Sequence, residues 1–169
     1  GVFLTGLGSA YYHMAPSNAT ILWDRLALTL LFMAFFSAVW GEHISASAAV
    51  KMVWPLVGLG LASVVYWYIT ETRGRGDLRI YAAVQFLPMV LVPLILIFYR
   101  SRLTGVGYVW GILAAYGIAK TAEVLDRAIY DALPGFSGHE IKHWVAAVGV
   151  FVYYLAGVKR KRRKSQVDT

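Results

Sequence analysis

Hydrophobic residues occur along this chain in blocks of about 20, and short polar segments separate the blocks. Apolar blocks of this length predict α-helices that cross a membrane. The predicted segments are residues 1–13, 19–40, 48–70, 78–99, 105–129 and 138–158. The first segment starts inside an apolar run, so we expect it to be partial and the chain to be truncated at its N-terminus. The pattern predicts an all-α, polytopic transmembrane bundle of six helices over residues 1–158, followed by a basic tail, residues 159–169.

Composition supports a membrane protein. Of the 169 residues, 59% are hydrophobic and the mean hydropathy is +0.58, which leaves too little polar surface for a globular protein in water. The net charge of +7 comes largely from the run KRKRRK, residues 159–164. A basic run directly after a span is typical of a cytoplasmic flank near anionic lipid heads, and nothing else in the sequence indicates nucleic-acid binding. The absence of cysteine excludes disulfides and thiolate metal sites.

Loop charges predict the orientation. Loop and terminal segments alternate between the two membrane faces. Those on one face hold nine basic residues, and those on the other face hold four. The nine are Lys51, Arg100, Arg102 and the six of the basic run, and the four are Arg73, Arg75, Arg79 and Arg127. The face with more Lys and Arg is usually cytoplasmic, so we expect the C-terminus in the cytoplasm.

Three histidines are predicted to meet near the opposite face. His139 and His143 are four residues apart at the start of the last helix, so both lie on one helical face. His13 ends the first helix at the same membrane face, and Asp24 lies only about 9 Å back along the next helix. Three neutral imidazoles with one open position form a common catalytic Zn²⁺ site. We therefore predict zinc bound by these histidines.

Two further side chains belong to the predicted site. Asp24 is expected to orient the water, accept its proton or bond a ligand imidazole, and Ser9, one turn before His13, to donate to a developing oxyanion. Alternatives remain open: Ser9 as a packing residue bonded to its own helix, Asp24 serving the helix dipole, and the HxxxH pair as two interfacial histidines. His43, near the cytoplasmic face, is interpreted as an interfacial residue outside the site.

The fifth predicted helix carries a second polar set. Lys120, Glu123 and Arg127 follow one stripe along it, which predicts an intrahelical ion-pair ladder. The alternative is that Lys120 and Glu123 line a cavity beneath the metal and contact a substrate head group or a ligand. The same helix contains three glycines that would allow neighbouring helices to approach closely, Gly107, Gly111 and Gly117.

The motifs Ser9-x3-His13-x10-Asp24 and His139-x3-His143 resemble those of the alkaline ceramidase family. This family belongs to a superfamily of seven-helix membrane proteins that includes the adiponectin and progestin receptors. The resemblance spans essentially the whole chain and implies that a further helix precedes the first one seen here. Arg25 follows Asp24, where eukaryotic ceramidases tend to have an acidic residue, so the form is closer to the prokaryotic branch. The acidic calcium-binding segment of some members would precede residue 1.

The resemblance implies a zinc-dependent hydrolase that cleaves the amide bond of ceramide-like lipids to a sphingoid base and a fatty acid. By this analogy the three histidines hold zinc, Asp24 acts on the water and Ser9 supports the site. The main alternative is a zinc-containing receptor or scaffold without turnover, as in the adiponectin-receptor relatives. A metal or proton transporter is a third possibility, but it needs polar residues through the whole membrane depth, and residues 146–158 contain no ionisable group except tyrosines.

Overall fold

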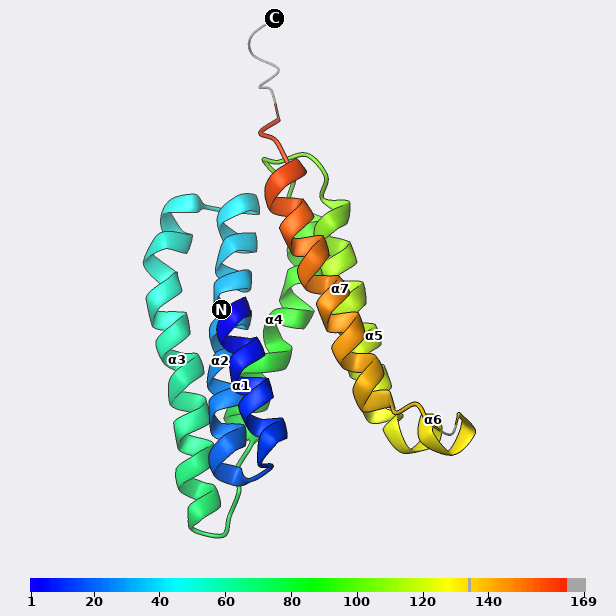
Figure 1. Cartoon of the computed structure of the whole chain (residues 1–169). Helices are drawn as coiled ribbons and strands as arrows, with labels where there is room; N and C mark the ends of the chain where they lie inside the picture. Colours follow the sequence, from blue (N-terminus) through cyan, green and yellow to red (C-terminus); the bar gives the residue numbers. More distant parts are fainter. Residues whose placement is uncertain (134, 164–169) are drawn as a thin grey trace, which may run out of the picture. The chain divides into compact units, whose positions relative to one another are not determined.

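The described residues form helices and no β-strand (Figure 1). The computed structural model describes residues 1–133 and 135–163, and the end of the predicted basic tail, residues 164–169, lies outside this range. The described residues contain seven helices, α1 (Val2–Met14), α2 (Asn18–His43), α3 (Ala46–Thr72), α4 (Arg79–Phe98), α5 (Gly107–Val124), α6 (Asp126–Ala132) and α7 (Gly138–Lys159). They divide into two compact units, unit 1 (Gly1–Arg100) and unit 2 (Ser101–Thr169).

Serine side chains begin three of these helices. Ser17, Ser45 and Ser137 each accept a hydrogen bond from a backbone N–H in the first turn of α2, α3 and α7. At α2 and α7 the third helical residue returns a bond to the serine N–H, which completes a capping box. These caps fix the register of the helices that carry the predicted site residues.

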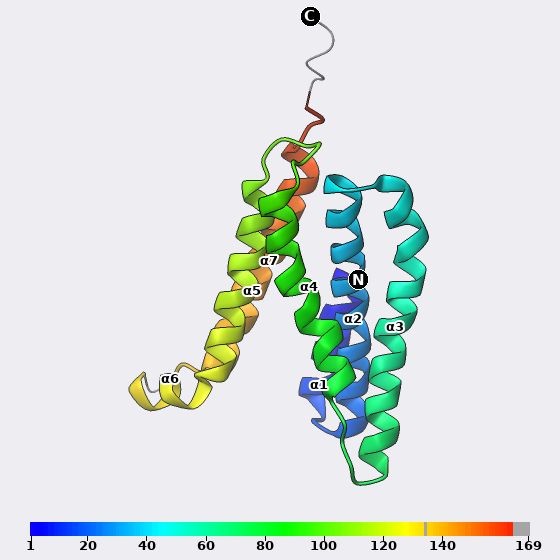
Figure 2. The same cartoon turned by 180° about the vertical axis from the view of Figure 1, so that it is seen from behind.

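In unit 1, α2 is the central helix and packs against α1, α3 and α4 (Figure 2). Small residues allow the close packing of α2 and α3: a Cβ on Gly60 would lie 3.0 Å from Cβ of Thr29. A hydrogen bond from Ser37 Oγ to the carbonyl oxygen of Ala49, 3.0 Å long, joins the same two helices inside the unit. These contacts hold α3 against α2.

A partly buried cation lies against the core of unit 1. The core residues Val64, Trp67 and Tyr81 are at most 9% exposed. The guanidinium carbon of Arg25 lies 3.9 Å from the centre of the Trp67 ring and 5.1 Å from that of Tyr81. Its Nη1 atom is buried and has no hydrogen-bond partner among the described residues. The aromatic faces therefore supply the attraction that holds this charge among apolar side chains.

Unit 2 is an antiparallel pair of helices, α5 and α7, with the short α6 between them. Two glycines lie at the helix contact: a Cβ on Gly111 would lie 3.3 Å from Cγ1 of Val152, and one on Gly149 would lie 3.2 Å from Cβ of Ala115. The prediction of close approach is therefore confirmed for Gly111. It is wrong for Gly107 and Gly117, because a Cβ at either position would meet no described atom within 4 Å.

The fifth predicted helix is broken in two. It was expected to run over residues 105–129, but α5 ends at Val124 and α6 starts at Asp126. The break at Leu125 also separates Arg127 from the predicted stripe. Arg127 Nε donates to Asp131 Oδ2 within α6 at 3.1 Å, so the ladder of three residues on one helix does not form.

Four helices, α2, α3, α4 and α7, are long and apolar enough to cross a membrane. At most 33% of each apolar window is buried inside the protein, and for α7 only 11% is. Large apolar side chains are exposed along these helices, for example Trp54, Phe98 and Trp144 at 75–77%. So much exposed apolar surface indicates a lipid environment. α5 is not in this set: its 18 residues include Lys120 and Glu123 and are less hydrophobic than the four spans.

Candidate metal site

A pair of histidines lies on one face of α7. His139 and His143 are one turn apart, and their Nε2 atoms are 3.2 Å from each other. The ring centres are 4.9 Å apart, with the planes inclined at 68°. His139 is half-buried and His143 is exposed. Two imidazole nitrogens directed at the same point are the arrangement from which an HxxxH pair can bind one metal ion.

The beginning of α7 is fixed by hydrogen bonds on both sides of His139. Ser137 accepts a bond from the backbone N–H of Glu140, and the Glu140 carboxylate accepts one from the N–H of Ser137. Asp126, the first residue of α6, accepts a hydrogen bond of 2.8 Å from the backbone N–H of His139. These bonds satisfy donors that a helix N-terminus leaves unpaired, and they set the position of the His139 backbone.

Gly138 brings the start of α7 into contact with the end of α5. A Cβ at this buried position would lie well inside van der Waals contact of the Ala122 carbonyl oxygen and 2.7 Å from Cα of Asp126. His139 can therefore occupy this position only because Gly138, directly before it, has no side chain. The sequence interpretation did not include Gly138. A glycine directly before the first histidine of the pair could have indicated close helix packing at this point.

The third predicted ligand, His13, lies at the end of α1 and is exposed. His13 belongs to unit 1 and the histidine pair to unit 2, and their common binding of one metal ion stays a prediction. Three neutral nitrogen donors suit Zn²⁺, which prefers imidazole and thiolate ligands in a tetrahedral shell with room for a fourth ligand. The donor set therefore fits the predicted metal.

Ser9 and Asp24 occupy neighbouring helices within unit 1. Gly8, directly before Ser9, is buried, and a Cβ there would lie 2.9 Å from the carbonyl oxygen of Trp23 and 3.0 Å from Cα of Asp24. This glycine allows the α1 backbone to reach the α2 backbone at Asp24. Gly8 was also missed from the sequence, and it holds the same position relative to Ser9 that Gly138 holds relative to His139.

Two alternative interpretations of these residues are not supported. The Ser9 hydroxyl forms no hydrogen bond with the described residues, so it is not bonded back to a carbonyl of its own helix. Asp24 is the seventh residue of α2, and no acidic residue lies in the first turn of that helix. Because the dipole effect falls off within the first turn, Asp24 is too far along the helix to serve it.

Comparisons with protein-family models, curated proteins and solved structures give no match to this chain. The side chains of the site are therefore the basis from which a function is inferred.

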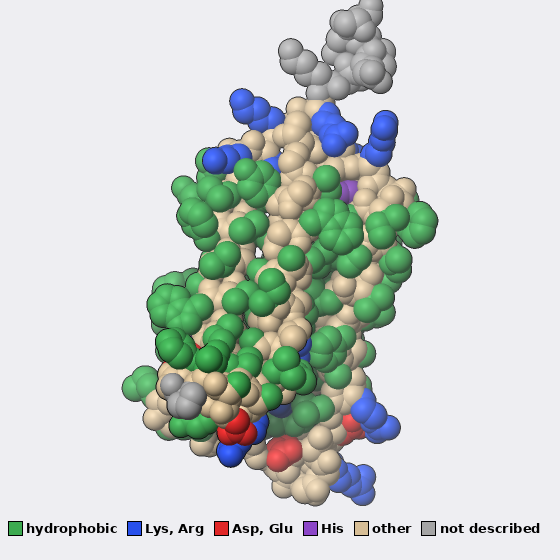
Figure 3. Space-filling view, turned by 90° about the vertical axis from the view of Figure 1, so that its right-hand side faces the viewer, with side chains coloured by type: hydrophobic (Ala, Val, Ile, Leu, Met, Phe, Trp, Pro, Cys, Tyr) green, Lys and Arg blue, Asp and Glu red, His purple; other side chains and the backbone are tan. Residues whose placement is uncertain are grey.

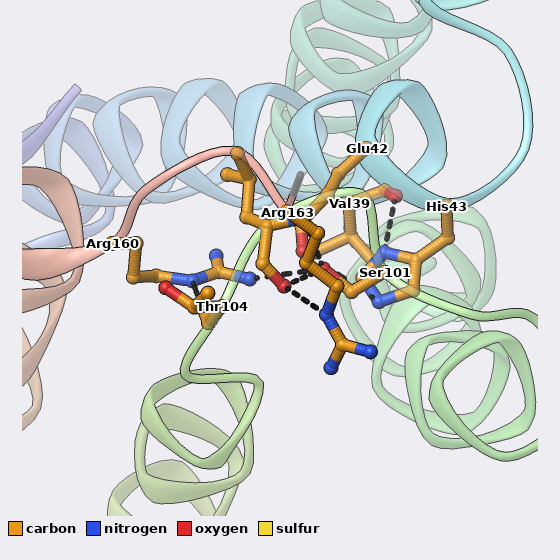
Figure 4. A network of polar contacts seen from close by, with 8 residues as sticks. Val39, Glu42, His43, Ser101, Thr104, Arg160 and Arg163 are labelled. Atoms are coloured by element: carbon orange, nitrogen blue, oxygen red, sulfur yellow. Dashed lines mark hydrogen bonds and ion pairs between the residues drawn. The ribbon is translucent and has the colours of Figure 1, made fainter. Parts of the chain in front are cut away.

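His43 differs from its interpretation as an interfacial residue. Its side chain is fully buried, and Nδ1 lies 3.0 Å from the carbonyl oxygen of Val39 (Figure 4). A carbonyl oxygen only accepts, so Nδ1 carries the proton and Nε2 is the atom left without a hydrogen-bond partner among the described residues. The Glu42 carboxylate is 3.7 Å from Nε2. His43 is therefore a core residue at the end of α2 and not part of the metal group.

The polar set on α5 joins α7 instead of continuing along its own helix. Glu123 accepts a bond from Lys120 on α5 and another, of 2.9 Å, from Lys142 on α7. Lys142 lies between the two histidines in sequence. The expected Lys120–Glu123 pair is confirmed, and Lys142 takes the place that the sequence interpretation gave to Arg127. This pairing ties the histidine-bearing turn of α7 to α5.

An open hollow of about 630 Å³ lies at the α3–α4 connection, lined by Tyr66, Thr70, Arg75, Gly76, Asp77, Leu78, Arg79 and Ala82. Hydrogen bonds from Arg79 hold the pKa of Asp77 well below its usual range. Asp77 therefore stays ionised and neutralises Arg79, to which it is bonded at 2.7 Å. None of the predicted site residues lines this hollow, and it is not part of the candidate metal site.

Proposed function

We propose that this chain is a zinc-dependent membrane hydrolase that cleaves the amide bond of ceramide-like lipids. The observation that carries the proposal is the histidine pair of α7, in which His139 and His143 present Nε2 atoms 3.2 Å apart. The spacing of Ser9, His13 and Asp24, which resembles that of the alkaline ceramidases, supports the choice of an amide substrate.

The three histidines would hold the metal. Zn²⁺ bound by three imidazoles supplies a Lewis acid and lowers the pKa of a bound water to about 7. Amide cleavage then needs a group that moves a proton, because an amine leaves poorly unless it is protonated. Asp24 takes the proton of the attacking water and delivers it to the nitrogen of the leaving sphingoid base. Ser9 donates its hydroxyl hydrogen to the negative charge that develops on the carbonyl oxygen.

The surroundings of the histidine pair suit a lipid substrate. After His143, α7 carries exposed apolar side chains, including Trp144 at 77% and Val148 at 58%. An acyl chain can therefore reach the site laterally through the bilayer while the amide and the head group stay near the water. We place the site on the non-cytoplasmic side, since the loops of the opposite face carry more Lys and Arg.

Turnover by the purified full chain tests the proposal. Incubation with long-chain ceramides should release fatty acid, measured by liquid chromatography with mass detection, and zinc should copurify with the protein. Asp24→Asn should keep the zinc and lose turnover by a factor of roughly 10²–10⁴, as expected for loss of a general acid–base. His143→Ala should lose both zinc and turnover, and Val158→Ala, an exposed position near the other end of α7, should keep both.

One outcome would support the alternative function. If zinc is bound and no long-chain amide yields fatty acid, the hydrolase proposal is wrong and a receptor or scaffold of the adiponectin-receptor type is favoured.

A further inference from the structure

The basic residues after α7 do not form a free tail in unit 2. Residues 160–163 run antiparallel to the loop that precedes α5, with an isolated β-bridge between Leu103 and Arg162. Backbone bonds from Thr104 to Lys161 (2.8 Å) and from Arg163 to Arg102 (3.0 Å) hold the two segments together. We call Arg102 and residues 159–163 the basic bridge. Six cationic side chains are thus displayed on an ordered backbone.

Side-chain bonds stiffen the basic bridge. Arg160 Nε donates to the carbonyl oxygen of Thr104 at 2.9 Å, and its Nη2 approaches Ser101 Oγ at 3.4 Å (Figure 4). Arg163 Nε donates to the carbonyl oxygen of Leu103 at 3.2 Å. Neutral carbonyl and hydroxyl groups accept these bonds, which fix the guanidinium groups in place.

Charge is segregated within unit 2. Its described carboxylates, Glu123, Asp126, Asp131 and Glu140, all lie where α5 ends and α7 begins. The basic bridge lies at the other end of α7, which has 22 residues and is therefore about 33 Å long. In Figure 3, blue side chains gather at the end of unit 2 where α7 stops, with apolar side chains along the helices below them. Lys159, Lys161, Arg162 and Arg163 form no ion pair with any described residue.

The position of the basic bridge selects its ligand. The length of α7 matches the thickness of the hydrocarbon core, about 30 Å, so a helix that crosses the bilayer places residues 159–163 at the depth of the lipid phosphates. Lys161, Arg162 and Arg163 are exposed there. Arginine and lysine side chains bind phosphate oxygens through charge-assisted hydrogen bonds. We propose that the basic bridge is a binding site for the phosphate head groups of anionic phospholipids.

This site is independent of the proposed hydrolase function. It lies at the opposite end of α7 from His139 and His143, and it needs neither zinc nor turnover. An ordered array differs from a mobile basic tail in one measurable respect: binding lipid to a surface that exists only in the folded protein raises the stability of the fold.

Thermal unfolding of the full chain in detergent tests the proposal. Phosphatidylglycerol added to the micelles should raise Tm, whereas the same amount of phosphatidylcholine should not. The diagnostic variant is Lys161→Gln/Arg162→Gln, because neither side chain makes a hydrogen bond in the structure and the backbone bonds remain. Each lost charge should weaken the apparent affinity for phosphatidylglycerol about fivefold. Arg73→Gln/Arg75→Gln removes two charges from the α3–α4 loop and should leave the shift unchanged.

Several results would overturn the proposal. They are an equal Tm shift with phosphatidylcholine, an undiminished shift in Lys161→Gln/Arg162→Gln, or an equal loss of the shift in Arg73→Gln/Arg75→Gln. A comparable shift with inorganic phosphate alone would show a general anion effect, and displacement of the lipid by a short oligonucleotide at lower concentration would point to nucleic acid instead. The double variant should melt at the wild-type temperature in phosphatidylcholine, and a lower value there would show that the bridge is structural.

Discussion

The Nε2 atoms of His139 and His143 lie 3.2 Å apart on successive turns of α7. Two neutral imidazoles at this distance share at most one hydrogen bond, whereas a metal ion can accept the lone pairs of both. A Ser137 cap, an Asp126 acceptor and a buried Gly138 hold the backbone that carries the pair. The chain therefore fixes two of the three candidate ligands before any metal binds.

Zinc should stabilise the fold through this pair. Adding Zn²⁺ to protein stripped with a chelator should raise Tm, because an ion bound only by the folded state contributes about 2.7 kcal/mol at a hundredfold excess over its Kd. The shift should disappear in His139→Ala and persist in Trp144→Ala. Differential scanning fluorimetry with and without zinc measures it. A shift of the same size in His139→Ala would show that the ion binds elsewhere.

Gly138→Ala should disturb the metal site through the backbone. The added methyl group would overlap the Ala122 carbonyl oxygen, so α7 must move away from α5, at a cost of about 1–3 kcal/mol. Both Tm and bound zinc per chain should fall. Gly157→Ala on the same helix is the control, since its Cβ meets no described atom within 4 Å, and it should be neutral or slightly stabilising. Equal behaviour of the two variants would contradict the close packing at Gly138.

Gly8→Ala tests whether the close packing of α1 against α2 is needed for stability and for turnover. Its Cβ would press on Trp23 and Asp24 in α2, whereas a Cβ on Gly6, two residues earlier, meets nothing within 4 Å. We expect Gly8→Ala to lower Tm and ceramide turnover together, and Gly6→Ala to change neither. Activity is measured by released fatty acid, and stability by thermal unfolding in the same detergent. Retained turnover in Gly8→Ala would remove Ser9 and Asp24 from the mechanism.

Arg25→Lys should destabilise unit 1 by about 1 kcal/mol. The planar guanidinium lies over Trp67 and beside Tyr81, and an ammonium group cannot stack on the rings in the same way. Chemical unfolding followed by tryptophan fluorescence measures the change. Lys142→Arg provides a charge-conserving control away from this core. A variant as stable as the wild type would show that the stacking contributes nothing.

Glu123→Gln should weaken the α5–α7 contact because two lysines lose the carboxylate that pairs with them. The three side chains are between 22% and 37% exposed, so the loss should be modest, about 1 kcal/mol. The double variant Glu123→Gln/Lys142→Met should lose less than the sum of the two single variants, measured as a double-mutant cycle of unfolding free energies. Strict additivity would mean that the pair contributes no coupling.

The sequence predicted four helices well. The bounds of α2, α3, α4 and α7 lie within three residues of the prediction, because hydropathy acts over neighbouring residues, and serine caps fix the starts of α2, α3 and α7. The prediction failed at Leu125, where one expected helix became two. No local feature of the sequence predicts this break, because residues 119–129 contain no proline or glycine.

The candidate site was partly visible from the sequence. Periodicity alone placed His139 and His143 on one face, since residues i and i+4 are neighbours on any helix. It could not identify Lys142 as the partner of Glu123, nor the burial of His43, because both depend on which helices pack together. The roles of Gly8 and Gly138 were also hidden, since a glycine is required only where an opposing backbone approaches.

The sequence by itself determined the membrane environment, most of the helices and the candidate site residues. These follow from hydropathy and from the spacing of residues along one helix. Tertiary structure decided the break between α5 and α6, the pairing of Glu123 with Lys142, and the close approach of α7 to α5 that sets the backbone of His139. It also decided that the basic run pairs with the loop before α5. The reason is that contacts between distant segments depend on shape at the packed surfaces, which no local pattern encodes.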